Sequence, residues 1–231
     1  MKAAPRQPRR MEADPFRPCV PFTWVPWCIP SESQNGPSCA GHGLGNFKEI
    51  MLRRYKGIDT FGTMEQIDGD AIWFRARKMF YAGNMDGGLY IPEAFAAAMA
   101  MGIFAPGSML MTIPRREAMH SPQFELTPFI DGHDVSGWVN HGTNQENGQV
   151  FQGSYPDGTG GHCTVDVSRM DQDGQNFWQI LNSWGVKAGW HGLYIYTESL
   201  DEVTGLGDEK YYVQEPPGWE QHDGWRKWVM G

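Results

Sequence analysis

One cysteine stands in a sequence context that suits nucleophilic chemistry. Cys39 follows an irregular segment, residues 34–38, and opens a run whose apolar residues recur at helical spacing as far as Tyr55. A thiol at a helix N-terminus lies near the positive end of the helix dipole and near unpaired backbone N–H groups, and both favour the reactive thiolate. We therefore interpret Cys39 as a nucleophile, although a cysteine without partners is equally well explained as a small buried hydrophobe.

The acid/base partner of such a thiol is predicted at His162. This residue follows the glycine-rich stretch 157–161 and begins the segment HCTVDVS, whose side chains would alternate between two faces of a strand. We expect the face of Cys163 to be buried and the face of His162 to be presented. The chain has seven histidines, so this assignment depends on a further residue nearby.

That further residue is Asn182, which ends an apolar strand predicted over 177–181. The segment DQDG at 171–174 predicts a hairpin turn that would bring Asn182 beside His162. An asparagine oxygen can accept a hydrogen bond from one imidazole nitrogen, so that the other nitrogen faces the thiol. Trp184, two residues later, could shield this bond from water. The sequence thus predicts a catalytic set of Cys39, His162 and Asn182.

The pattern of the whole chain places helices before strands. We expect helices over 39–55 and 70–81, and a third with Pro92 in its first turn and Gly102 beyond its end. Gly41, Gly43 and Gly45 each weaken the first helix by about 1 kcal/mol relative to alanine, which predicts a close backbone approach there. Strands are expected at 109–113, 135–139, 150–152, 162–168, 177–181 and 193–197. This order predicts an α+β protein with a helical half and a sheet half.

The composition excludes several classes of protein. The 231 residues are 40% hydrophobic and carry a net charge of -8, which allows a packed core and gives no basic nucleic-acid footprint. Residues 1–14 lack the apolar region of a signal peptide, and no stretch is apolar enough to span a membrane. The four cysteines form no C-x-x-C pair, and His133 and His141 lack metal-ligand spacing. We expect no cofactor, metal, nucleic acid or membrane partner, and a cytoplasmic or virion-associated protein.

The order of these motifs resembles the papain family of cysteine peptidases. The resemblance rests on Gln34 before Cys39, on Gly161-His162, and on Asn182-Ser183-Trp184-Gly185 followed by the segment GWHGLYI at 189–195. It implies a two-lobed fold, in which the cysteine opens the long helix of an N-terminal helical lobe and the C-terminal lobe is an antiparallel, barrel-like sheet. It also implies that Gln34 donates to the oxyanion and that Gly87, Gly88, Gly161 and Trp184 bind substrate.

Three departures from the family pattern stand beside this resemblance. Gln34 lies five positions before Cys39, one fewer than in most of the family, and Ala40 stands where many members have tryptophan. The residues ahead of the resemblance are also too few for an inhibitory propeptide, so we expect no zymogen activation.

The resemblance implies a peptidase that hydrolyses peptide bonds through an acyl-enzyme on Cys39. We expect residues 1–14 to be a flexible tail, 15–200 the papain-like catalytic domain, with an extended proline-rich segment at 15–38, and 201–231 a tryptophan-rich extension. Either tail could dock to a larger assembly, or the C-terminal one could pack back on its own domain. The alternatives are a transamidase or cell-wall amidase with the same thiol and imidazole, and a structural component, such as a virion protein, that retains the peptidase fold.

Overall fold

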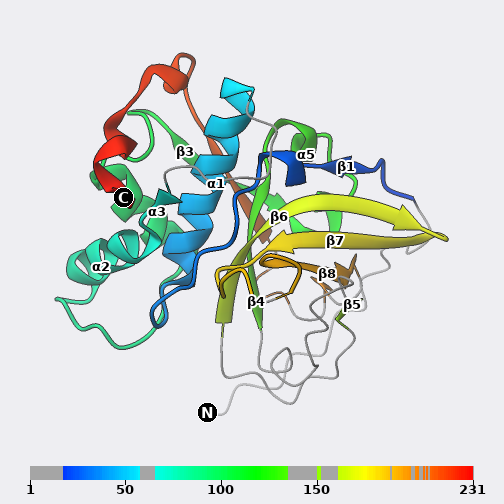
Figure 1. Ribbon diagram of the computed structural model, residues 1–231, viewed down its shortest axis with the longest axis horizontal. Coiled ribbons are helices and arrows are strands. Elements are labelled where there is room, and N and C mark those ends of the chain that lie inside the picture. Colours follow the sequence, from blue (N-terminus) through cyan, green and yellow to red (C-terminus); the bar gives the residue numbers. More distant parts are fainter. Residues whose placement is uncertain are drawn as a thin grey trace, which may run out of the picture.

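The computed structural model describes residues 18–57, 66–134, 150–151, 161–187, 189–198, 201–202, 205, 207 and 209–230. The predicted N-terminal tail and the predicted strand at 135–139 lie outside these residues. Figure 1 shows helices gathered on one side of the molecule and a sheet on the other, with α1 (Cys39–Lys56) between them. The α+β fold with a helical N-terminal half and an antiparallel sheet in the C-terminal half is confirmed.

The three long helices form where the sequence predicts them. α1 begins at Cys39, and α2 (Gly69–Phe80) begins after Asp68, whose carboxylate accepts a hydrogen bond from the Ala71 N–H. A side-chain acceptor at this position satisfies one of the free N–H groups of the first turn. α3 (Ile91–Ala100) has Pro92 in its first turn, and Gly102 follows it with a φ of 74°.

Three glycines near the start of α1 let other backbone segments approach closely. A Cβ atom on Gly41 would collide with the carbonyl oxygen of Gly69 at the start of α2. A Cβ on Gly43 would lie 2.8 Å from the Cys163 sulfur, and one on Gly45 would lie 3.0 Å from the Ile67 oxygen. The close approach predicted from these glycines is confirmed, and it brings the sheet directly under the first turns of α1.

The main sheet has eight strands among the described residues. Their order is β3 (Met109–Pro114), β9 (Glu209–Gln214), β4 (Phe129–Asp134), β6 (Gly161–Gln172), β7 (Gln175–Leu181), β8 (Leu193–Thr197) and β5 (Val150–Phe151), with β1 (Phe22–Thr23) paired to β6. All pairs are antiparallel except β5 with β8. β6 and β7 form the predicted hairpin, whose turn places Asp173 and Gly174 at φ values of 55° and 77°.

β6 corrects one expectation from the sequence. We expected one buried and one presented face, but both faces are buried from His162 to Arg169. Cys163 packs against Gly43 of α1, while Asp166 on the other face lies 2.9 Å from the ammonium of Lys210 in β9. The polar side chains that suggested a solvent-exposed face are paired inside the protein instead.

The predicted C-terminal extension is built into the fold wherever the structure describes it. β9 lies between β3 and β4 in the main sheet, and β10 (Val229–Met230) pairs with β2 (Gln66–Ile67) beside the helices. Trp225 is buried, and the Trp228 indole donates to the Met101 carbonyl at 2.8 Å. Figure 1 shows this segment, in red, returning to the helical side. Of the two alternatives for the C-terminal segment, packing back on the domain is therefore the one observed.

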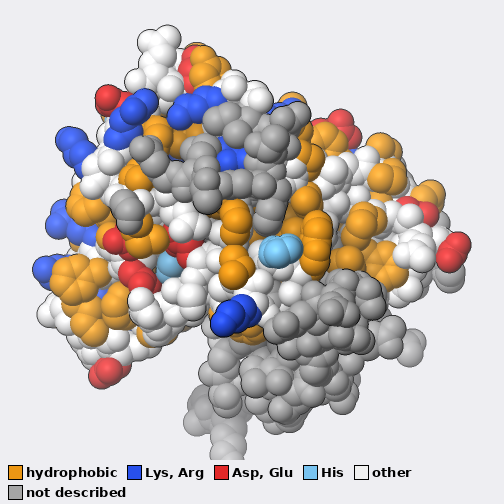
Figure 2. Space-filling view, viewed as in Figure 1, with side chains coloured by type: hydrophobic (Ala, Val, Ile, Leu, Met, Phe, Trp, Pro, Cys, Tyr) orange, Lys and Arg blue, Asp and Glu red, His pale blue; other side chains and the backbone are white. Residues whose placement is uncertain are grey.

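The described part of the chain also has short helical elements. These are η1 (Val25–Trp27), α4 (Arg115–Ala118), α5 (Gln123–Leu126), η3 (Trp219–Gln221) and η4 (Gly224–Trp228). One hydrophobic core joins both halves. No helix in the described part of the chain is long and apolar enough to cross a membrane. On the face shown in Figure 2, positive and negative side chains are interspersed with hydrophobic ones, and the described residues form no continuous basic surface there.

Candidate active site

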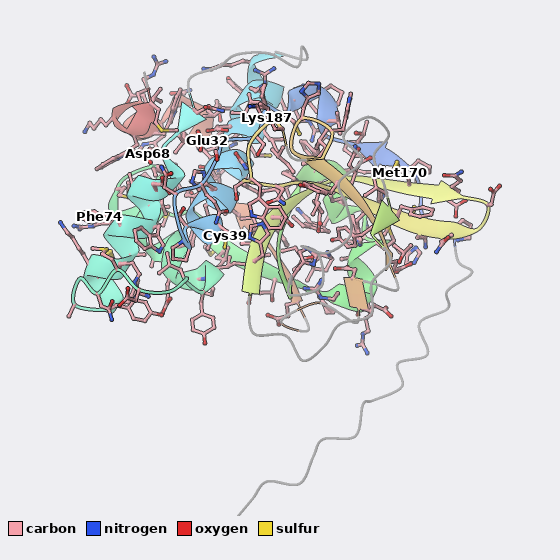
Figure 3. The ribbon with its side chains drawn as sticks, turned by 60° about the horizontal axis from the view of Figure 1, so that its bottom comes forward. Glu32, Cys39, Asp68, Phe74, Met170 and Lys187 are labelled. Atoms are coloured by element: carbon pink, nitrogen blue, oxygen red, sulfur yellow. The ribbon has the colours of Figure 1, made fainter. Side chains whose placement is uncertain are left out.

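A cavity of about 780 Å³ lies between the helical half and the sheet half. Figure 3 shows Cys39 at the junction of the two halves, at the start of α1. The cavity wall includes five of the residues predicted for the site, namely Gln34, Cys39, Gly88, Gly161 and His162. Residues from three distant parts of the sequence therefore meet at one opening. Gly87, Trp184 and Asn182 lie next to this lining rather than in it.

Cys39 is the first residue of α1, and only 8% of its surface is exposed. Burial raises the pKa of the Cys39 thiol, while hydrogen bonds from the backbone N–H groups of Cys163, Ala40 and Cys39 itself lower it by less. The N–H groups at the start of the helix thus stabilise a thiolate at this sulfur, as the sequence position predicts. Burial nevertheless keeps the resting sulfur protonated.

The orientation of His162 follows from its contact with Asn182. Nε2 of His162 lies 2.6 Å from Oδ1 of Asn182, and the same oxygen accepts a hydrogen bond from the Ser183 N–H at 2.7 Å. Because a backbone N–H can only donate, the amide atom that faces both groups is the oxygen. Nε2 must therefore carry a proton, and in the neutral ring Nδ1 keeps a free lone pair. This is the tautomer that can accept a proton from a thiol.

The ring of His162 is held from a second side by Trp184. Their ring centroids are 4.7 Å apart with an interplanar angle of 26°, which is a stacked arrangement. Trp184 is itself fixed by a bridge to Ser33 and by an edge contact with Tyr194. Burial lowers the pKa of His162 to about 4, against the opposing effect of the Asn182 hydrogen bond. Near pH 7 the imidazole is therefore neutral.

No hydrogen bond joins Cys39 and His162 among the contacts of the described residues. Catalytic hydrogen bonds are often long in structures without substrate and shorten only in the complex. Both side chains line the same cavity. His162 has the tautomer that can accept a proton, and backbone N–H groups surround the Cys39 sulfur. Together these features describe a neutral thiol and imidazole at one opening.

Gln34 lies on the same cavity although the segment before Cys39 is one residue short. Its backbone N–H donates to the Ser183 carbonyl at 2.9 Å, and its side-chain oxygen accepts from the Ser183 hydroxyl at 2.5 Å. One hydrogen of the side-chain NH₂ group goes to the Gly36 carbonyl at 2.7 Å, which leaves its second hydrogen available for a ligand. Gly36 has a φ of 83°, so the turn expected to absorb the missing residue uses the left-handed conformation that glycine allows.

The Gly87–Gly88 segment is held in place by Arg77, a residue that sequence reasoning missed. The Arg77 guanidinium donates to the backbone carbonyls of Asn84 at 2.6 Å and Gly88 at 3.1 Å, and also to that of Asp86. Gly87 has a φ of 92°. An arginine in α2 gives no sequence signal for this role, because its partners are backbone carbonyls of a loop that only the fold brings near.

A second cluster of charged groups is buried, and it reaches the cavity wall at Arg115. Its members are Asp131, Asp166, Asp201, Arg115, Lys210, His133 and Tyr196. The possible ligand atoms of Asp131, His133 and Asp166 lie within 4.8 Å of one another. The Lys210 ammonium already contacts Asp131 and lies 2.9 Å from Asp166 and 3.0 Å from Asp201. Since each of these carboxylates is paired with Lys210, and Asp131 and Asp201 are also paired with Arg115, we interpret the cluster as a buried ion network and assign no metal to it.

No protein-family model matches the chain, and no curated protein matches it. Solved structures do match. The digestive procathepsin L2 proteinase of Tenebrio molitor larval midgut is 15% identical with a TM-score of 0.62, and the match covers 86% of this chain and 69% of that one. The bromelain protease of Ananas comosus, solved in complex with the E64 inhibitor, is 15% identical with a TM-score of 0.59, over 85% and 99% of the two chains.

A third match extends the same result. The proform of the ragweed pollen cysteine protease Amb a 11 is 15% identical with a TM-score of 0.62, covering 87% of this chain and 66% of that chain. The chain therefore has the fold of the papain-like cysteine proteases over nearly its whole length, at low sequence identity. The fold predicted from the motif order is confirmed.

Proposed function

We propose that the protein is a papain-like cysteine peptidase that hydrolyses peptide bonds through an acyl-enzyme on Cys39. The observation that supports this most is the tautomer of His162, since Asn182 and Ser183 together leave Nδ1 as the free base of a ring that borders the same cavity as Cys39. A papain-like fold implies a peptide or protein substrate.

The first half of the reaction forms the acyl-enzyme. Nδ1 of His162 takes the proton of the Cys39 thiol, and the sulfur attacks the carbonyl carbon of the scissile peptide bond. The resulting oxyanion receives hydrogen bonds from the Cys39 N–H and from the second hydrogen of the Gln34 amide. His162 then gives its proton to the leaving amine, the C–N bond breaks, and a thioester remains on Cys39.

The second half releases the acid product. His162 removes a proton from a water molecule, which attacks the thioester carbonyl, and the C–S bond breaks as the thiol regains its proton. Asn182 keeps the imidazole oriented through both halves, because its oxygen holds Nε2–H in each protonation state of the ring. Every group that reacts in these two steps belongs to the chain, the substrate or water.

The proposal is tested by profiling cleavage of a peptide library by the wild-type protein and by Cys39→Ala. We expect the wild type to cut peptide bonds and the variant, with unchanged circular dichroism, to cut none. Products that appear only when an acceptor amine is added would indicate a transamidase, and a wild type that is inert towards peptides and acceptor amines would contradict catalysis.

A further inference from the structure

The segment that carries Gln34 is hydrogen-bonded on both sides of this residue to one pair of side chains, of which the first is buried and the second is partly exposed. The pair consists of His42, in the first turn of α1, and Asp70, in the first turn of α2, with their Nε2 and Oδ1 atoms 3.2 Å apart. Before Gln34, the Glu32 carboxylate lies 2.7 Å from Nδ1 of His42. Figure 3 shows Glu32 on the segment that runs alongside α1.

After Gln34, two further side chains reach the same pair. The Ser38 hydroxyl donates to Oδ1 of Asp70 at 2.5 Å, and the Asn35 amide donates to its Oδ2 at 3.3 Å. Gln34 thus stands between one residue tied to His42 and two tied to Asp70. Gln34 lies only five positions before Cys39, so these contacts help to set where the segment that carries the Gln34 amide lies relative to the Cys39 sulfur.

His42 is built into the fold for this arrangement. It is 2% exposed, and a Cβ atom on Gly69 would lie 2.5 Å from its ring, so that only glycine leaves room for the ring under α2. Burial opposes a charge on the ring, but the hydrogen bonds and charges of Glu32 and Asp70 outweigh it and raise the pKa of His42. As an imidazolium the ring donates from both nitrogens, and each carboxylate receives one N–H.

We infer that the His42–Asp70 pair is a positioning device for the oxyanion donor Gln34, acting through Glu32, Asn35 and Ser38. This inference rests on the proposed function, because it assigns a task within the same reaction. His42 does not touch the cavity. Its effect on rate passes through Gln34, and displacement of a catalytic group by about 1 Å is enough to cost up to about 10²-fold in turnover.

A double-mutant cycle tests the inference. Gln34→Ala and Asp70→Asn are made singly and together, with His42→Gln as a second way to break the pair and His222→Gln as the control. Nε2 of His222 lies 2.7 Å from the Gly102 carbonyl oxygen. His222 does not line the cavity. We expect Asp70→Asn and His42→Gln to lower kcat about tenfold or more while KM changes less than about twofold. The Asp70→Asn/Gln34→Ala double variant should be no slower than Gln34→Ala alone. Multiplicative losses in the double variant would overturn the inference.

Hydrogen exchange gives a readout that needs no turnover. Backbone amides of residues 33–38 should exchange faster in Asp70→Asn and His42→Gln than in the wild type and in His222→Gln, at matched thermal stability. Unchanged exchange in this segment would overturn the inference even if the wild type is an active peptidase. Faster exchange in a wild type without peptidase activity would uphold the positioning role and contradict the proposed function instead.

Discussion

Oδ1 of Asn182 accepts two hydrogen bonds at once, from Nε2 of His162 and from the Ser183 N–H. The second bond fixes which amide atom faces the imidazole, and the imidazole tautomer follows from it. Asn182→Ala removes this constraint without removing a group that reacts. We expect kcat to fall, but by less than the loss in His162→Ala, for which general acid–base catalysis sets a scale of about 10²–10⁴. Steady-state kinetics of the three variants check the order, and equal losses in Cys39→Ala, His162→Ala and Asn182→Ala would contradict it.

The pH dependence of the reaction follows from the lowered pKa of His162. Nδ1 can accept the thiol proton only while the ring is neutral, so activity is present above the folded-state pKa of about 4 and is lost as the pH falls through it. The Asn182 hydrogen bond raises this pKa, so Asn182→Ala should move the acidic limb of kcat/KM to lower pH. The measurement is kcat/KM between pH 3 and pH 8, and an acidic limb near 6.5, the ordinary range of histidine, would contradict the burial argument.

Gln34 should act on the transition state alone. Its second amide hydrogen has no partner in the described contacts, and Gln34 lines the cavity in which an oxyanion would develop. Gln34→Ala is expected to lower kcat by about 10²–10³ and to leave KM nearly unchanged. A silent variant would show that the turn at Gly36 aims the side chain away from the reacting carbonyl during catalysis.

Arg77 should matter for peptide binding rather than for the chemistry of the thiol. Its guanidinium holds three carbonyls of the loop that ends at Gly88, and a lysine ammonium cannot reach all three with one nitrogen. We expect Arg77→Lys to raise KM for a peptide about tenfold, the equivalent of one lost hydrogen bond. The rate at which a small alkylating reagent modifies Cys39 is the control and should not change. A parallel loss in both measurements would indicate damage to the Cys39 end of the site.

The buried ion network should dominate the stability of the sheet half. Lys210→Met leaves the carboxylates of Asp131, Asp166 and Asp201 with Arg115 as their remaining strong cation, and breaking a buried pair in this way costs about 3–5 kcal/mol. Chemical denaturation measures this loss, with the exposed Lys227→Met as the control. A loss below about 1 kcal/mol would mean that water or rearrangement compensates the network.

The sequence predicted the helices well because their signals are local. The helical spacing after Cys39 and the pair of Pro92 in a first turn and Gly102 beyond the helix end each act within a few residues. The strands β4 and β9 were missed because Phe129–Asp134 and Glu209–Gln214 carry charged residues that look solvent-exposed. Asp131 and Lys210 are compatible with a buried sheet only because each finds its partner in the other strand, a contact between positions far apart in the chain.

The residues of the candidate site also divide into those with a local sequence signal and those without one. The sequence predicts Cys39, His162 and Asn182 as site residues because each is marked by a local motif: a helix start, a glycine-rich stretch and the Asn-Ser-Trp-Gly sequence. Arg77, His42 and Asp70 were missed because their partners come from other segments. A glycine at 69 beside a buried histidine at 42 becomes meaningful only after α1 and α2 are packed together.

Cys39 is the proposed nucleophile of this cavity, and covalent labelling with a peptidyl epoxide tests this role most directly. Cys163 lines the same cavity and provides a matched control. We predict that intact-mass and peptide analysis will show one label per chain, on Cys39. Labelling should persist in Cys163→Ser, become much slower in His162→Ala and be absent in Cys39→Ala. Labelling of Cys163 in place of Cys39, or labelling spread over all four cysteines at similar rates, would contradict the account.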